Sequence, residues 1–219
     1  MGHLTGFGLK NFRVFKEKTW FDFAPITVLT GPNNSGKSSL IKAILMQKEN
    51  KFTEHSILDS LKFSTDNSLL GDFNSCISDN NSENNEISFY FPFHFRYIQT
   101  ELILRLSFKV VKNNEKVKLT YFKVTEKKSG KIIFDFYETK SRHWNGKVNF
   151  IYIKNEINNS LKEGFKIRKK DERLNRILID MEDDNNSNYF SEKELLDEND
   201  IKGAYFQEIF PLPKKDILF

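Results

Sequence analysis

The chain has 219 residues, of which 38% are hydrophobic and 29% charged, and its 22 phenylalanines supply material for a substantial core. This composition excludes a mini-protein and a chain that is disordered throughout. The net charge of +4 permits nucleic-acid binding without indicating it, because the lysines are spread along the chain. The longest apolar runs fall far short of the roughly 20 residues that span a bilayer, so we expect no transmembrane helix and no membrane partner.

The N-terminus and the cysteine content both indicate a cytoplasmic protein. The start, Met1–Gly6, lacks the basic and apolar regions of a secretory signal, and Gly6 stands where a myristoylation signal has Ser or Thr. The one cysteine, Cys76, cannot form an internal disulfide, which fits a reducing compartment. We therefore expect a cytoplasmic location.

The first fifty residues predict a strand, a loop and a helix. Three runs alternate in the manner of strands, at residues 4–15, 19–23 and 26–30. The third run, Ile26–Thr30, is short, apolar and β-branched, as a buried central strand would be. It leads directly into Gly31–Ser39, and a helical spacing of apolar residues then continues to about Lys48, at Leu40, Ile41, Ile44 and Leu45.

After residue 51 the residue pattern of the chain changes twice. Residues 52–85 are polar and irregular, whereas strand-like runs follow at 87–95, 101–111, 116–126, 131–138 and 147–154. Asn113-Asn114 and Ser129-Gly130 are hairpin signals, so these runs predict an antiparallel meander of four or five strands within a sheet that is mixed overall. After Glu156 the chain is highly charged, and we expect helices and loops there.

The motif Gly31-x-x-x-x-Gly36-Lys37-Ser38 matches the P-loop pattern in full, between an apolar run and a helical one. Glycines let the backbone curl so that N–H groups and the positive end of the helix dipole meet phosphate oxygens. Lys37 would supply a point charge to the β- and γ-phosphates, Ser38 a hydroxyl to Mg²⁺, and Ser39 a donor to the α-phosphate. The motif therefore predicts binding of ATP with Mg²⁺.

The variable positions of the loop indicate its class. The sequence Gly-Pro-Asn-Asn-Ser-Gly-Lys-Ser-Ser at residues 31–39, with Asn33, Asn34 and Ser35 inside it, resembles the ABC-type ATPases of the RecF, SMC and OLD group. Residues 9–15, Leu-Lys-Asn-Phe-Arg-Val-Phe, look like the opening strand of that group. By this resemblance, Arg13 and Phe15 are expected near the nucleotide, although a surface charge and a core aromatic are equally ordinary roles for these residue types.

A second resemblance is narrower. Leu69-Leu70-Gly71-Asp72-Phe73, followed by the run that begins at Glu86, looks like an element of RecF/OLD-like AAA-type ATPases, many of which come from anti-phage or mobile-element loci. The alternative interpretation of Gly71-Asp72 is an ordinary turn. Together, the two resemblances cover about residues 4–95.

The sequence departs from the family pattern where hydrolysis would be catalysed. No Leu-Ser-x-Gly signature is found, because the pair Ser129-Gly130 lies between two strand runs and reads as a hairpin turn. Asp180 and Glu182 are candidates for the Walker B acids, but Met181 separates them and only three apolar residues precede them. An acidic surface turn is the competing interpretation of this segment.

Other classes are disfavoured by missing motifs. A GTPase would carry an Asn/Thr-Lys-x-Asp base-reading motif, and a small-molecule kinase would carry an Arg-rich lid where this chain has a meander. The four histidines show no metal-ligand or protease spacing with acids. The basic run 166–170 could contact a phosphate backbone, but a solvated basic face is the better explanation of it.

The sequence thus predicts an α/β P-loop NTPase lobe, ABC-ATPase-like with a mixed sheet, plus an antiparallel β-meander subdomain and a charged helical C-terminal segment. Its expected divisions are a nucleotide-binding core, an irregular connection, the β subdomain and the charged segment, at residues 1–50, 51–85, 86–155 and 156–219.

Two functions follow from this interpretation. In the family that the chain resembles, ATP lies between two heads, and a Walker B glutamate orients water. The first function is an ATPase head that is complete only with a further segment or a second head, coupled to DNA or to a defence effector protein. The second is a nucleotide-binding regulatory module that assembles without hydrolysing ATP.

Overall fold

We describe the fold from a computed structural model of the chain. The structure describes residues 4–50, 61–63, 70–78, 85–95, 98–111, 116–139, 144–149, 152, 153, 155 and 156. Within them, the strands are β1 (Gly6–Lys10), β2 (Thr19–Asp22), β3 (Ile87–Phe95), β4 (Ile98–Val111), β5 (Lys116–Glu126), β6 (Ile132–Glu138) and β7 (Trp144–Val148). The helices are α1 (Lys37–Glu49) and α2 (Phe73–Cys76).

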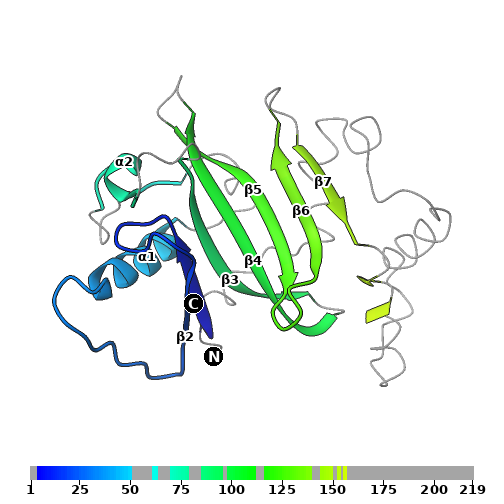
Figure 1. The fold of residues 1–219 in the computed structure, drawn as a ribbon, viewed down its shortest axis with the longest axis horizontal. Coiled ribbons are helices and arrows are strands. Elements are labelled where there is room, and N and C mark those ends of the chain that lie inside the picture. Colours follow the sequence, from blue (N-terminus) through cyan, green and yellow to red (C-terminus); the bar gives the residue numbers. More distant parts are fainter. Residues whose placement is uncertain are drawn as a thin grey trace.

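The strands form one seven-stranded sheet in the order β2-β1-β3-β4-β5-β6-β7 (Figure 1). Every neighbouring pair in this order is antiparallel. The expected meander is therefore confirmed from β3 to β7, whereas the expected mixed sheet is wrong for the described residues. The strand expected at residues 26–30 forms no ladder, and the strands from β3 to β7 pair in chain order as hairpin neighbours. The sheet joins strands from both sides of the predicted division between core and β subdomain, and that division stays a prediction.

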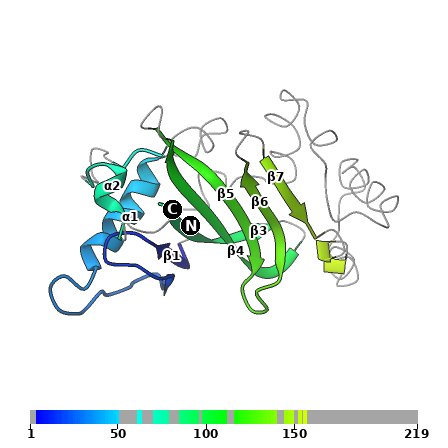
Figure 2. The same cartoon turned by 45° about the horizontal axis from the view of Figure 1, so that its top comes forward.

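One face of the sheet carries the hydrophobic core. Alternate residues of β3 are buried there, at Ile87, Phe89, Phe91 and Phe93. The ring centroids of Phe7 and Phe91 lie 5.3 Å apart, and those of Phe89 and Phe108 lie 6.0 Å apart, which ties β1, β3 and β4 together. Both views show α1 and α2 at the end of the sheet where β2 and β1 lie, away from β6 and β7 (Figures 1 and 2).

Helix α1 confirms the predicted helix and packs on this core. Its buried residues are spaced to lie on one side, at Ser39, Leu40, Ala43, Met46 and Gln47. The helix ends at Glu49, where the side-chain amide of Asn50 donates to the carbonyl of Met46 over 2.9 Å. Within the described residues, neither helix combines the length and the apolar character needed to cross a membrane.

The opposite face of the sheet is polar and is tied together by Arg105. Its guanidinium donates to Glu86 Oε1 over 2.7 Å and to Ser107 Oγ over 3.1 Å. It also lies 4.7 Å from the centroid of the Tyr121 ring and 5.9 Å from that of Tyr90. This network spans β3, β4 and β5 and gives the polar face a fixed arrangement.

Two predicted strands end well before their expected bounds. The run 4–15 was expected as one strand, but β1 ends at Lys10 because Asn11 and Arg13 adopt positive φ angles of 55° and 50°. The run 147–154 was also expected as a strand, but β7 lies at Trp144–Val148 and the backbone at Tyr152 is helical.

Of the two predicted hairpin turns, the one at Ser129-Gly130 lies within the described residues. Between β5 and β6, Gly130 has a φ of +70° and its N–H donates to the carbonyl of Glu126 over 2.9 Å. The hairpin at Ser129-Gly130 is therefore confirmed. Asn113-Asn114 lies outside the described residues.

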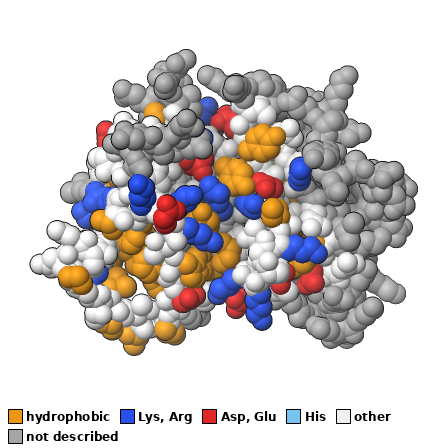
Figure 3. All heavy atoms as spheres, in the orientation of Figure 1, with side chains coloured by type: hydrophobic (Ala, Val, Ile, Leu, Met, Phe, Trp, Pro, Cys, Tyr) orange, Lys and Arg blue, Asp and Glu red, His pale blue; other side chains and the backbone are white. Residues whose placement is uncertain are grey.

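The predicted buried strand Ile26–Thr30 is wrong. The segment has no strand structure, and the side chains of Ile26 and Val28 are 86% and 79% exposed. Figure 3 shows hydrophobic side chains on the surface at the lower left, over the segment that joins β2 to α1 in Figure 1. The physical reason is that β2 pairs only with β1, so that no described strand lies beside this segment to bury it.

Candidate nucleotide-binding site

The loop 31–36 connects the exposed segment to α1 through three left-handed backbone positions. Gly31, Asn34 and Gly36 have φ angles of 139°, 65° and 96°. Two of these residues are glycines, for which such angles are free of strain, and Asn tolerates them better than most other residues. The N–H of Ser35 donates to the carbonyl of Pro32 over 3.4 Å and tightens the turn. The glycine spacing of the motif thus corresponds to the backbone shape that the chain adopts.

Helix α1 begins at this loop with an uncapped N-terminus. The first helical bond runs from the N–H of Leu40 to the carbonyl of Gly36 over 2.9 Å, and no side chain caps the helix. The N–H groups of Lys37, Ser38 and Ser39 therefore precede the helical ladder, and the positive end of the helix dipole lies with them. Ser38 is exposed and Ser39 is buried, so the hydroxyl of Ser38 is the accessible one.

The ammonium of Lys37 lies over the loop. Its Nζ donates to the carbonyl oxygens of Gly31 and Pro32 over 2.7 and 2.6 Å, and to Ser35 Oγ over 3.3 Å. These three acceptors are neutral and belong to the loop itself. A lysine charge with neutral partners, next to a helix N-terminus, is a suitable place for phosphate oxygens, which can replace those acceptors.

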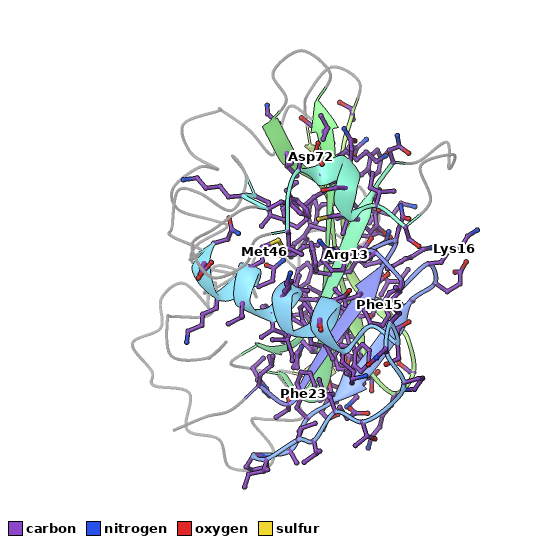
Figure 4. The ribbon with its side chains drawn as sticks, turned by 90° about the vertical axis from the view of Figure 1, so that its left-hand side faces the viewer. Arg13, Phe15, Lys16, Phe23, Met46 and Asp72 are labelled. Carbon is purple, nitrogen blue, oxygen red and sulfur yellow. The ribbon has the colours of Figure 1, made fainter. Side chains whose placement is uncertain are left out.

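Phe15 and Val14 lie against the same loop. A Cβ placed on Gly36 would be 2.6 Å from Phe15 Cζ and 2.7 Å from Val14 Cγ2. In Figure 4, Phe15 lies beside the N-terminal end of α1, and Met46 lies further along the helix. The structure therefore brings Phe15 to the predicted loop, and it adds Val14, which sequence reasoning missed. The sequence signal would have been its place beside Phe15 in the same turn.

Arg13 points to a different neighbour. Its Nη2 donates to the carbonyl of Leu70 over 3.2 Å, and its backbone N–H donates to the carbonyl of Cys76 over 2.7 Å. Its Nε is buried without a hydrogen-bond partner in the described part of the chain. Figure 4 places Arg13 between α1 and α2. The structure thus joins the two segments of the sequence resemblance, and the expected approach of Arg13 to a nucleotide stays a prediction.

The segment with Gly71-Asp72 forms a tight turn into α2. Gly71 has a φ of +83°, and Asp72 Oδ1 accepts a hydrogen bond from the N–H of Ser75 over 2.8 Å. This hydrogen bond lowers the pKa of Asp72 below its ordinary value. Burial, in contrast, raises the pKa of the Cys76 thiol. Cys76 is therefore a packing residue beside Arg13 rather than a reactive thiolate.

The described residues do not include the predicted acids for hydrolysis. Asp180 and Glu182 lie outside the described residues. Across the described ranges, no cluster of three or more His, Cys, Asp or Glu side chains could hold a metal ion. Asn33, Asn34 and Ser35 are exposed on the loop, where their polar groups are accessible to a ligand. The described part of the predicted site is thus the loop 31–36 and the first turn of α1.

Comparisons with solved structures, curated proteins and family models relate the chain to known proteins. One solved structure, from a study of ATP-driven dimerization and DNA-stimulated activation of SMC ATPases, is 16% identical over 82% of this chain and 98% of that chain, with a TM-score of 0.31. No curated protein matches the chain. The family model described as AAA ATPase domain matches residues 4–217. The match covers nearly the whole chain and confirms the predicted P-loop ATPase: the chain belongs to the AAA ATPase domain family.

Proposed function

We propose that the chain binds ATP with Mg²⁺ through residues 31–39 and supplies one half of a composite ATPase site. The observation that carries this proposal is the Lys37 ammonium, held by two carbonyl oxygens of the loop next to the uncapped N-terminus of α1. An anion can take the place of those neutral acceptors with a gain in electrostatic attraction. The family to which the chain belongs supports ATP as that anion.

Each predicted residue has a role in this proposal. Gly31 and Gly36 shape the loop, and Lys37 moves its Nζ from the loop carbonyls to the β- and γ-phosphate oxygens. Ser39 donates to the α-phosphate, and Asn33, Asn34 and Ser35 line the mouth of the loop. Arg13 and Phe15 belong to the turn between β1 and β2, where Phe15 contacts Gly36 and Arg13 joins the turn to Leu70.

Magnesium fits the donor set of the loop through the hydroxyl of Ser38. This side chain is exposed in the first turn of α1, next to the lysine. When bound with ATP, the ion supplies neutralisation of the phosphate charge. The chain itself contributes the fixed helix end and the lysine charge.

The proposed second half comes from a further segment or a second head. It would supply a signature loop and an acid that orients water, as in the RecF, SMC and OLD group that the sequence resembles. The same resemblance supports engagement of two heads in the cytoplasm, coupled to DNA or to a defence effector. The alternative is a module that binds ATP without hydrolysis.

The test measures Mg-ATP affinity and ATP turnover on one sample of the purified chain. We expect Lys37→Ala to weaken Mg-ATP binding about 10- to 100-fold, because a charge-assisted contact is lost. Lys42→Ala is the matched control, since it removes a lysine from the same helix and outside the motif. Wild-type affinity in Lys37→Ala would contradict nucleotide binding by this loop.

Turnover then separates the two functions. Lys37-dependent binding without turnover supports an incomplete site. Turnover that appears when a segment with a Walker B acid and a signature is added supports the composite ATPase. Turnover by the chain alone contradicts the composite site, and Asp180→Asn, which we expect to have little effect, would then show whether Asp180 is the missing acid.

A further inference from the structure

The turn between β1 and β2 places an aromatic ring directly against the backbone of the phosphate loop. Phe15 Cζ lies 2.6 Å from the position that a Cβ on Gly36 would occupy, and Phe15 Cε1 lies 3.1 Å from it. The ring tip therefore faces the residue from which α1 starts. Gly36 is itself buried at this contact, although residues 31–35 are exposed. The contact fixes where the loop backbone stands relative to the sheet.

The turn that carries Phe15 is rigid. The N–H of Phe12 donates to the carbonyl of Phe15 over 3.0 Å, and the N–H of Phe15 donates back to the carbonyl of Phe12 over 2.9 Å. The Phe15 ring also meets the Phe21 ring edge-on, with 5.6 Å between centroids. The ring is thus held both by the backbone of its own turn and by β2.

The far side of the same turn is anchored to the segment 70–78. The N–H of Arg13 donates to the carbonyl of Cys76 over 2.7 Å, the N–H of Ser78 donates to the carbonyl of Asn11 over 3.3 Å, and Phe12 forms a bridge with Ile77. Figure 4 shows Arg13 on the α2 side of Phe15. The turn therefore cannot shift away from Gly36 without breaking these backbone hydrogen bonds.

We propose that Phe15 is a positioning residue that acts on the nucleotide through Gly36, rather than a base-stacking residue. Its ring tip supports the loop from the side of the sheet and holds Gly36 at its left-handed φ of 96°. The N–H groups that follow Gly36 then stand where phosphate oxygens can bind them. This inference rests on the proposed nucleotide binding and adds the residue that holds the binding loop in shape.

The experiment compares Mg-ATP with Mg-tripolyphosphate, which keeps the three linked phosphates and lacks the base and sugar. A residue that positions the phosphate loop affects both ligands alike. We expect Phe15→Ala to weaken both by the same factor, about tenfold. Loss of ATP affinity alone, with tripolyphosphate binding unchanged, would mean that Phe15 contacts the base and would overturn the proposal.

A second variant tests the direction of the contact. Phe15→Tyr adds a hydroxyl at Cζ, the ring atom nearest Gly36, so we expect it to push the loop and to weaken both ligands at least about threefold. A ring that stacks on a base would tolerate this change. Wild-type affinity for both ligands in Phe15→Tyr would therefore overturn the proposal, whereas retained affinity in Phe15→Leu, which keeps an apolar side chain, supports it.

Controls separate this inference from general destabilisation and from the proposed function. Phe136→Ala removes an equally half-buried ring from β6, and we expect it to lower stability without changing either affinity. The affinities of each variant are measured at a temperature well below its thermal unfolding transition. If Lys37→Ala loses binding but Phe15→Ala retains it, the nucleotide site stands and only the role of Phe15 fails. If Lys37→Ala also retains binding, the proposed function fails as well.

Discussion

Gly36 is the residue of the loop where steric demands are strictest. Its φ of 96° is unfavourable for any side chain, and an added Cβ would collide with both Val14 and Phe15. We expect Gly36→Ala to lower the free energy of unfolding by roughly 1–3 kcal/mol and to weaken Mg-ATP binding at least about tenfold. Urea denaturation and a nucleotide titration measure the two effects.

Gly130 is the matched control for this prediction. Its φ is also left-handed, at 70°, but no atom lies within 4 Å of an added Cβ. Gly130→Ala should therefore lower stability by about 1 kcal/mol from backbone strain alone and leave nucleotide affinity unchanged. An affinity loss equal to that of Gly36→Ala would contradict a local role for Gly36.

Asp72 makes a pH-dependent contribution to the turn before α2. Because the N–H of Ser75 stabilises the carboxylate, the pKa of Asp72 is lower in the folded chain than in the unfolded one. The resulting stability is present above the unfolded value of about 3.9 and is lost as the pH falls through the lowered folded value. Asp72→Asn keeps an acceptor for the cap but cannot titrate. Urea denaturation between pH 7 and pH 3 should show a smaller loss of stability in this variant than in the wild type, and an equal loss would contradict the assignment.

At the scale of elements, the polar face of the sheet depends on one guanidinium. Arg105 joins Glu86, Ser88 and Ser107 and lies between two tyrosine rings. We expect Arg105→Lys to lower the free energy of unfolding by about 1–2 kcal/mol, because an ammonium cannot reproduce the planar set of donors. Nucleotide affinity should not change. Urea denaturation of the variant checks the first statement, and full stability would show that the network is only a surface ion pair.

The sequence predicted elements well where the pattern is long and local. The alternation in residues 116–126 matches the bounds of β5, and the P-loop spacing matches the start of α1. The run 26–30 failed because apolar character reports a tendency to be buried, while burial needs a neighbouring strand. Near β7, Asn149 accepts a hydrogen bond from the N–H of Tyr152 over 3.0 Å, and this local contact ends the strand in a helical turn.

The candidate site was predictable in part for the same reason. The loop residues are contiguous, so a motif shows them, and their roles follow from phosphate chemistry. The contact between Phe15 and Gly36, and that between Arg13 and Leu70, join residues that lie far apart in sequence. Only the folded sheet brings these pairs together.

At the scale of the whole molecule, Leu29 packs against the core, whereas the exposed side chains of the segment 26–30 should contribute little to stability. Val28 is 79% exposed, whereas Leu104 is 6% exposed in the middle of β4. We expect Val28→Lys to change the free energy of unfolding by less than about 0.5 kcal/mol and Leu104→Ala to lower it by about 2–5 kcal/mol. Urea denaturation of the two variants decides whether the segment belongs to the core, since a large loss in Val28→Lys would show that it is buried.

The strand order also sets the sequence in which the chain can fold. Strands β4 to β7 follow one another and pair as neighbours, so their contacts close short loops and form early. β1 must instead find β3, with Lys10 opposite Ser88, after the intervening chain has been looped out. The loop 31–36 lies within this segment between β1 and β3. We therefore expect a refolding chain to form its hairpins before the loop geometry, so that nucleotide binding returns no earlier than the pairing of β1 with β3.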